Sequence, residues 1–264
     1  MTFYDVSSKS EALGNTVRAL ARVSEVLEAR GARWIVIGAL ARELAVTLRI
    51  DSTRHRRTGD LDIAVALGDV GEVAALIEEL GGRQVHRHCV EISGTHVDLV
   101  PFGGVEEGRV VSWSDGASLD VTGLAEAASQ PDEVQVTADL KVPVASIPAQ
   151  INLKLVARRD RHHDHGTKDG VDLGYLLDGW THEPLADAVW ADEDAISWAE
   201  YDPHRAAAYK LGREAGALLG SQARKAVLAV LEDPRSRDHL ALNLGIREGT
   251  ERLAAWRAGF QSVL

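Results

Sequence analysis

The sequence is poor in cysteine: Cys89 is the one cysteine among 264 residues, which excludes an intramolecular disulfide and any zinc site made of several cysteines. It contains no run of about 18 apolar residues, so no segment is predicted to span a membrane. Residues 1–13 contain no apolar signal core, and we therefore expect a soluble cytoplasmic protein. The G-x-S-x-G, G-x-x-x-x-G-K-[ST] and G-x-G-x-x-G motifs are also missing, which excludes serine hydrolase, P-loop and Rossmann sites.

Basic residues are outnumbered, with 29 Lys+Arg against 40 Asp+Glu and a net charge of −11. This balance excludes a general nucleic-acid coat, because such binding needs clustered Lys and Arg. The charge is uneven, however. Residues 178–202 contain eight acids and no Lys or Arg, which suits a cationic substrate, whereas residues 203–264 contain ten basic groups and six acids, which suits RNA.

Hydrophobic periodicity predicts an α+β protein in two parts. The first part, residues 1–146, is predicted to be a mixed β-sheet core with flanking helices, and the second, residues 147–264, a helical domain. Predicted strands cover 33–38, 60–67, 83–92, 95–102, 109–113, 133–137 and 140–145, with helices at 8–30, 39–48, 70–80 and 122–129. Further helices are predicted at 147–160, 168–178, 184–200, 203–218, 221–231 and 248–260.

The sharpest local pattern is Asp60-Leu61-Asp62. Side chains alternate along a strand, so Asp60 and Asp62 point to the same face. Two adjacent carboxylates repel each other unless a cation lies between them, and Mg²⁺ accepts such a pair together with phosphate oxygens. Asp98 lies in a second apolar strand, where a carboxylate is costly unless it is paired or metal-bound. Three such carboxylates suit a two-metal phosphoryl or nucleotidyl transfer site; the alternative is a solvent-facing Asp-x-Asp on an edge strand.

Phosphate contacts are predicted at the start of the helix 39–48 and in the segment directly before Asp60. Gly38 ends a strand and opens a helix, so that backbone N–H groups can approach a phosphate. Arg56, Arg57 and Thr58 directly precede Asp60 and could neutralise phosphate charge.

Charged side chains also recur at helical spacing in the second part. Lys154 and Arg158 share a helix face, and so do Asp169 and Asp172 on the next helix. The alternative interpretation is a set of salt bridges between helices, each of which contributes little.

The order strand, Gly38, helix, basic loop, Asp60-x-Asp62 and Asp98 resembles the nucleotidyltransferase superfamily of polymerase-β-like fold. The segments GALAREL, RRTGDLDIAV, HVDLVPFGGV, VTGLAEA, INLKLVARRDR and KDGVDLGYLL, within residues 33–180, resemble the AbiEii-type toxin nucleotidyltransferases. The resemblance implies a nucleotidyltransferase-type sheet core and Mg²⁺- or Mn²⁺-dependent transfer of an NMP from an NTP. It assigns metal binding to Asp60, Asp62 and Asp98 and triphosphate binding to Lys154. It also makes Asp169 the acidic residue of a second motif. It also assigns phosphate contacts to Gly38, Ala39, Arg56, Arg57, Thr58 and Arg158; Ala39 stands where the usual motif has Gly or Ser.

The same resemblance implies an acceptor hydroxyl on RNA, such as the 3′ end of tRNA, or on protein, and a cognate antitoxin as a partner. A small-molecule, antibiotic-type nucleotidyltransferase is the alternative enzyme, and a catalytically idle protein that binds a partner is the alternative outside enzymes. The run His162–His165 and the pair His86 and His88 are interpreted as surface segments.

Overall fold

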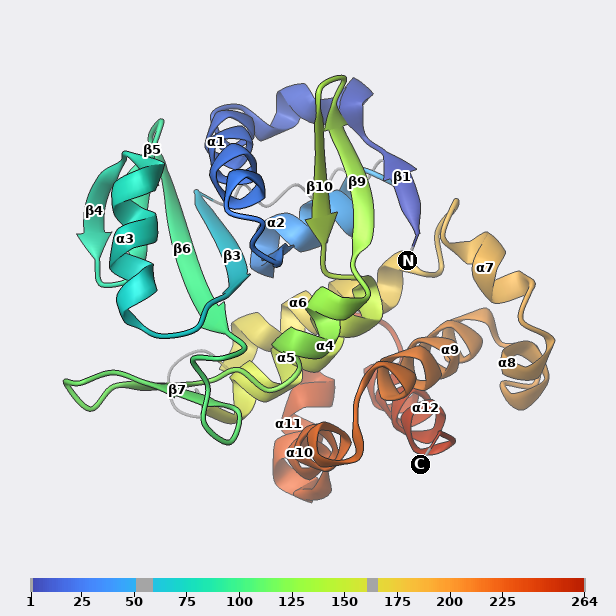
Figure 1. Ribbon diagram of the computed structural model, residues 1–264. Helices are drawn as coiled ribbons and strands as arrows, with labels where there is room; N and C mark the ends of the chain where they lie inside the picture. The colour runs from blue at the N-terminus through green and yellow to red at the C-terminus, as the bar shows by residue number, and fades with distance from the viewer. Residues whose placement is uncertain (1, 51–58, 161–165, 264) are drawn as a thin grey trace. The chain divides into compact units, whose positions relative to one another are not determined.

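The computed structural model describes residues 2–50, 59–160 and 166–263 (Figure 1). These residues form two compact units: the first ends at Ser146 and the second begins at Ile147, while Arg49 and Ile50 group with the second. Within the described ranges, no helix combines the length and the apolar character that crossing a membrane requires.

The first unit is built on a mixed eight-stranded sheet with the strand order β1-β9-β10-β2-β3-β6-β5-β4. The β3 strand is central, parallel to β6 and antiparallel to β2. The strands are β1 (Phe3–Asp5), β2 (Trp34–Ile37), β3 (Asp60–Ala66), β4 (Arg83–His86), β5 (Cys89–Ile92), β6 (Thr95–Phe102), β9 (Asp132–Thr137) and β10 (Leu140–Val144), with β7 (Val110–Ser112) and β8 (Ser118–Asp120) as a separate pair. The helices are α1 (Thr16–Ala29), α2 (Gly38–Arg42), α3 (Gly71–Leu80) and α4 (Leu124–Ser129). The predicted mixed sheet is thereby confirmed.

Alternation at the start of the central strands β3 and β6 separates buried side chains from polar ones. In β3 and β6, Leu61, Ile63 and Leu99 are at most 1% exposed. The helices α1 and α3, which contact each other, lie side by side over the sheet (Figure 1), and the apolar stripe of α1 is buried. Burying such side chains is the main stabilising term for the sheet. The even-numbered residues at the start of both strands therefore project from the opposite face.

The N-terminal elements differ from the prediction of a single helix over 8–30. A 3₁₀ helix over Ser7–Leu13 ends at Gly14, whose φ is +54°, and α1 begins only at Thr16. A left-handed residue cannot continue a helix, so the chain changes direction here. The predicted helix 39–48 is α2 followed by a π-helical turn over Glu43–Thr47.

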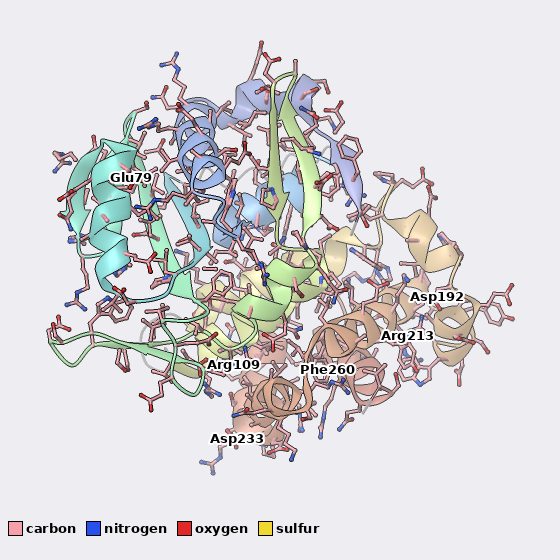
Figure 2. The ribbon with its side chains drawn as sticks, viewed as in Figure 1. Glu79, Arg109, Asp192, Arg213, Asp233 and Phe260 are labelled. Carbon is pink, nitrogen blue, oxygen red and sulfur yellow. The ribbon has the colours of Figure 1, made fainter. Side chains whose placement is uncertain are left out.

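The described residues of the second unit form helices without strands, as predicted from the loss of strand patterns after residue 146. The helices are α5 (Ile147–Asp160), α6 (Gly166–Gly179), α7 (Ala186–Trp190), α8 (Glu193–Trp198), α9 (Pro203–Leu218), α10 (Ser221–Glu232), α11 (Pro234–Asn243) and α12 (Gly249–Gln261). The predicted helix 184–200 is wrong as a single element. Asp192 separates α7 from α8, because its carboxylate accepts the Ala195 N–H and so caps the start of α8. The same carboxylate also contacts Arg213 of α9, and Figure 2 labels both residues.

Glycines allow the helices α9 and α12 of this unit to approach closely. A Cβ atom added to Gly212 of α9 would lie 2.8 Å from the Trp256 carbonyl carbon of α12, and one on Gly259 would lie 2.8 Å from that of Tyr209. Real Cβ atoms do not pack at such distances, so these positions accept only glycine unless the helices separate.

Candidate active site

The strand register brings the three predicted carboxylates to one face. In the parallel pairing of β3 with β6, Asp62 lies directly opposite Asp98, and Asp60 lies directly opposite His96. Paired residues on neighbouring strands project to the same side, about 4.8 Å apart across the sheet. We call Asp60, Asp62 and Asp98 the carboxylate face; Asp60 is exposed and the other two are half-buried.

Asp62 is held against the backbone at the start of α2. A Cβ atom added to Gly38 would lie 2.8 Å from Asp62 Cγ and closer still to Oδ2, so the carboxylate occupies the space that any other residue would fill. The φ of Gly38 is +68°, a left-handed conformation that L side chains rarely adopt. Gly38 therefore leaves room for the Asp62 carboxylate, a contact that the sequence alone did not indicate. Ala39, the neighbouring predicted phosphate contact, is the second residue of α2.

Asp98 interacts with the single cysteine. Cys89 of β5 lies opposite Asp98, and its side chain hydrogen-bonds to the carboxylate. Burial, this hydrogen bond and the negative charges of Asp98, Asp60 and Asp62 raise the pKa of the Cys89 thiol to about 12. The thiol is therefore neutral at physiological pH and is not a nucleophile in this setting.

A second polar row runs beside the first. Glu91 of β5 lies opposite His96, which lies opposite Asp60. His96 Nδ1 is 3.6 Å from Asp60 Oδ1, and Nε2 is 4.0 Å from Glu91 Oε2. The sequence interpretation missed both His96 and Glu91, although the alternation in Thr95–Asp98 already places His96 on the side of Asp98.

The donor chemistry of the carboxylate face fits a hard divalent cation, since Mg²⁺ prefers carboxylate oxygens. Across residues 2–50, 59–160 and 166–263, no three His, Cys, Asp or Glu side chains are gathered closely enough to hold an ion as they stand. The residues therefore provide suitable ligands on one face, and side-chain rotations would have to complete the coordination.

In the second unit, the predicted charged residues of α5 and α6 do meet. Lys154 Nζ is 2.7 Å from Asp172 Oδ2 and 3.5 Å from Asp169 Oδ1. The Lys154 side chain is 22% exposed, whereas those of Asp169 and Asp172 are 2% and 5% exposed. Asp169 Oδ2 is buried and has no hydrogen-bond partner in the described part of the chain.

Arg158 completes this group, which we call the Lys154 cluster (Lys154, Arg158, Asp169 and Asp172). Arg158 Nη2 lies 3.0 Å from His239 Nδ1 of α11. Burial lowers the pKa of the Arg158 guanidinium, and the charge of Asp169 acts in the opposite direction. Two cations and two carboxylates balance, so the cluster resembles a partly buried ion-pair network between helices.

The comparisons with known proteins are sparse. No protein-family model matches the chain, and no curated protein matches it. Among solved structures, the chain is similar to the solution structure of the antibiotic-resistance factor ANT(2'')-Ia, with 15% identity over 85% of this chain and 97% of that one and a TM-score of 0.37. A TM-score this low does not establish a common fold, so the fold assignment rests on the sheet topology above.

Several predicted residues lie outside the described ranges. Arg56, Arg57 and Thr58 precede β3, and His162–His165 lie between α5 and α6, and neither group is described by the structure.

Proposed function

We propose that this chain is a Mg²⁺-dependent nucleotidyltransferase. The observation that carries the proposal is the register of β3 and β6, which gathers Asp60, Asp62 and Asp98 on one face while Asp62 occupies the space beside Gly38. The resemblance of these same residues to the nucleotidyltransferase superfamily supports the proposal independently of the geometry.

In the proposed reaction, an acceptor hydroxyl oxygen attacks the α-phosphorus of an NTP. A bond forms between that oxygen and phosphorus, the bond from the α-phosphorus to the bridging oxygen breaks, pyrophosphate leaves with that electron pair, and the hydroxyl proton passes to solvent. Divalent cations would supply charge neutralisation at the triphosphate and lower the pKa of the hydroxyl. Asp60 and Asp62 would hold them, and Asp98 would favour loss of the hydroxyl proton.

Lys154, Arg158, Asp169, Ala39, Arg56, Arg57 and Thr58 belong to the proposal through the resemblance alone. The proposed role of Lys154 in triphosphate binding needs a separate test, because a lysine already paired with two buried carboxylates has less charge to offer a triphosphate. If Lys154 binds the triphosphate, Lys154→Met should raise KM for NTP; if it only joins helices, stability should change while KM does not.

We further propose that the acceptor is an RNA 3′ end, because residues 203–264 carry an excess of basic groups. The test incubates the protein with each labelled NTP, Mg²⁺ and one of three pools: total tRNA, cell protein, or a small-molecule panel that includes aminoglycosides. Asp62→Asn is compared with Asp139→Asn, a matched control at an exposed aspartate in the turn between β9 and β10.

Label that appears in the RNA pool, requires Mg²⁺, is lost in Asp62→Asn and persists in Asp139→Asn supports both proposals. Label in the protein or small-molecule pool retains nucleotidyl transfer and rejects RNA as the acceptor. Absence of label with every nucleotide and pool contradicts the enzyme and favours a protein that only binds a partner.

A further inference from the structure

The three members of the carboxylate face differ in what lies beside them. Asp62 packs against the Gly38 backbone, and Asp98 hydrogen-bonds to the Cys89 side chain. The Asp60 side chain is 59% exposed, and His96 Nδ1 lies 3.6 Å from its Oδ1 on the same face. His96 is therefore close enough to influence the orientation of the Asp60 carboxylate.

The backbone fixes His96 opposite Asp60. The two residues are direct partners in the parallel ladder of β3 and β6, so their Cα atoms are one strand spacing apart. Moving His96 away from Asp60 would require a register shift, which would turn the buried Val97 and Leu99 toward the polar face. The pairing is consequently as secure as the core of the sheet.

Glu91 defines the other side of the imidazole. It is the direct antiparallel partner of His96 on β5, and it also contacts Arg83, its own partner on β4. One ring nitrogen of His96 thus faces Asp60 and the other faces Glu91. An imidazole between two such groups has a restricted ring orientation, as in carboxylate–histidine pairs around metal sites.

We propose that His96 is a positioning residue that directs the Asp60 carboxylate toward a divalent cation, with Glu91 orienting the His96 ring. The inference rests on the proposed function, since it assumes that Asp60 is a metal ligand. Closing the present 3.6 Å between His96 Nδ1 and Asp60 Oδ1 to a hydrogen bond needs only a small side-chain rotation. Groups that hydrogen-bond to a ligand carboxylate typically change metal affinity about 10–100-fold.

The exposure of this row makes the inference testable. The His96 side chain is 47% exposed and that of Glu91 is 31% exposed. Substituting His96 therefore opens no cavity in the core, and a loss of metal affinity would not reflect unfolding.

The experiment measures Mn²⁺ binding to the full chain by electron paramagnetic resonance, without nucleotide. The variants are His96→Ala, His96→Asn and His96→Gln. Asparagine places an amide nitrogen near the position of Nδ1, whereas the longer glutamine side chain reaches toward that of Nε2. His204→Ala, at an exposed histidine near the start of α9, is the control for losing an imidazole elsewhere.

We expect His96→Ala and His96→Gln to weaken Mn²⁺ binding about tenfold, His96→Asn to restore it to within about threefold, and His204→Ala to leave it unchanged. Equal affinities in wild type and His96→Ala, with binding still abolished by Asp62→Ala, would overturn the positioning role alone. No Mn²⁺ binding by the wild type, or binding that survives Asp62→Ala, would overturn the metal site of the proposed function and the inference with it.

Discussion

Gly38→Ala tests the relation between the backbone at the start of α2 and the carboxylate face. Two separate costs are expected. The first is the left-handed φ of +68°, which costs a residue with a Cβ about 1–2 kcal/mol. The second is displacement of the Asp62 carboxylate, whose Cγ would lie 2.8 Å from the new Cβ. Overpacking of this kind costs about 1–3 kcal/mol, so the total should be about 2–5 kcal/mol.

Gly31→Ala is the matched control. Gly31 has a φ of +62°, and a Cβ atom added there would have nothing within 4 Å. This variant should therefore show only the first cost, about 1–2 kcal/mol. Repeating Gly38→Ala in an Asp62→Ala background removes the displaced carboxylate but keeps the Cβ of residue 62, which lies 3.1 Å from the new Cβ, so the cost should fall toward that of Gly31→Ala. The difference is a coupling energy of about 1–3 kcal/mol.

The assay should report on the first unit alone, because a chain with two compact units need not unfold in one step. Hydrogen exchange at increasing urea, measured on peptides that cover β2 and β3, meets this requirement. If Gly38→Ala costs no more than Gly31→Ala, or if its cost is the same in the Asp62→Ala background, then Asp62 is not the reason for glycine at this position.

Three further outcomes are expected. Lys154→Met should destabilise the second unit by about 2–3 kcal/mol in urea unfolding, because it leaves the buried Asp169 and Asp172 without their ammonium partner; a change below about 0.5 kcal/mol would contradict this. The Cys89 thiol should react with a disulfide reagent at pH 8 far more slowly in the folded than in the urea-unfolded protein, since its pKa is raised to about 12, and equal rates would refute the raised value. Burial alone would raise the pKa of Asp192, but an amide of α8 and two cations of α9 hold it below 3.8. Its contribution to stability is thus complete above that pH and lost as the pH falls toward the folded-state pKa, so Asp192→Asn should flatten the acid limb of the stability curve, and an unchanged limb would argue against it.

The sequence predicted those features that depend on local pattern. Alternation identified β3 and the shared side of Asp60 and Asp62, and 3.6-residue periodicity gave the bounds of α5 and α9. These features follow from which side chains must leave water, and a stretch of about ten residues contains that information.

Two helices of the second unit show where periodicity was insufficient. The helix α11 was not predicted, because Leu240 and Ala241 are its only buried residues and most of its other side chains are polar. The usable indication was Pro234 at the first turn after Asp233, whose carboxylate accepts the Ser236 N–H. Asp192 would likewise have indicated the start of α8. In both places the capping residue was more informative than the apolar pattern.

Register between strands is a different kind of information, and the sequence does not contain it locally. Asp98 could be assigned to a strand, but its position opposite Asp62, which is 36 positions earlier in the sequence, depends on how β6 pairs with β3. That pairing also determines which residues become neighbours of the site, and so His96 and Glu91 were missed. Side-chain alternation alone predicted which residues of a strand share a face, but not which residues of the neighbouring strands lie opposite them.

The raised pKa of Cys89 links the register of these strands to the proposed metal binding without any appeal to similar proteins. Its sulfur lies where three carboxylates act together, and all three raise its pKa in addition to burial. Burial is the largest cause of the shift, and the smaller coulombic part that the three carboxylates add reports a negative electrostatic potential, which favours a cation. The single cysteine, which at first only excluded disulfides and cysteine-based zinc sites, therefore indicates the sign of the field over the carboxylate face. A divalent cation there would relieve the repulsion among Asp60, Asp62 and Asp98, which gives the face a physical reason to bind one.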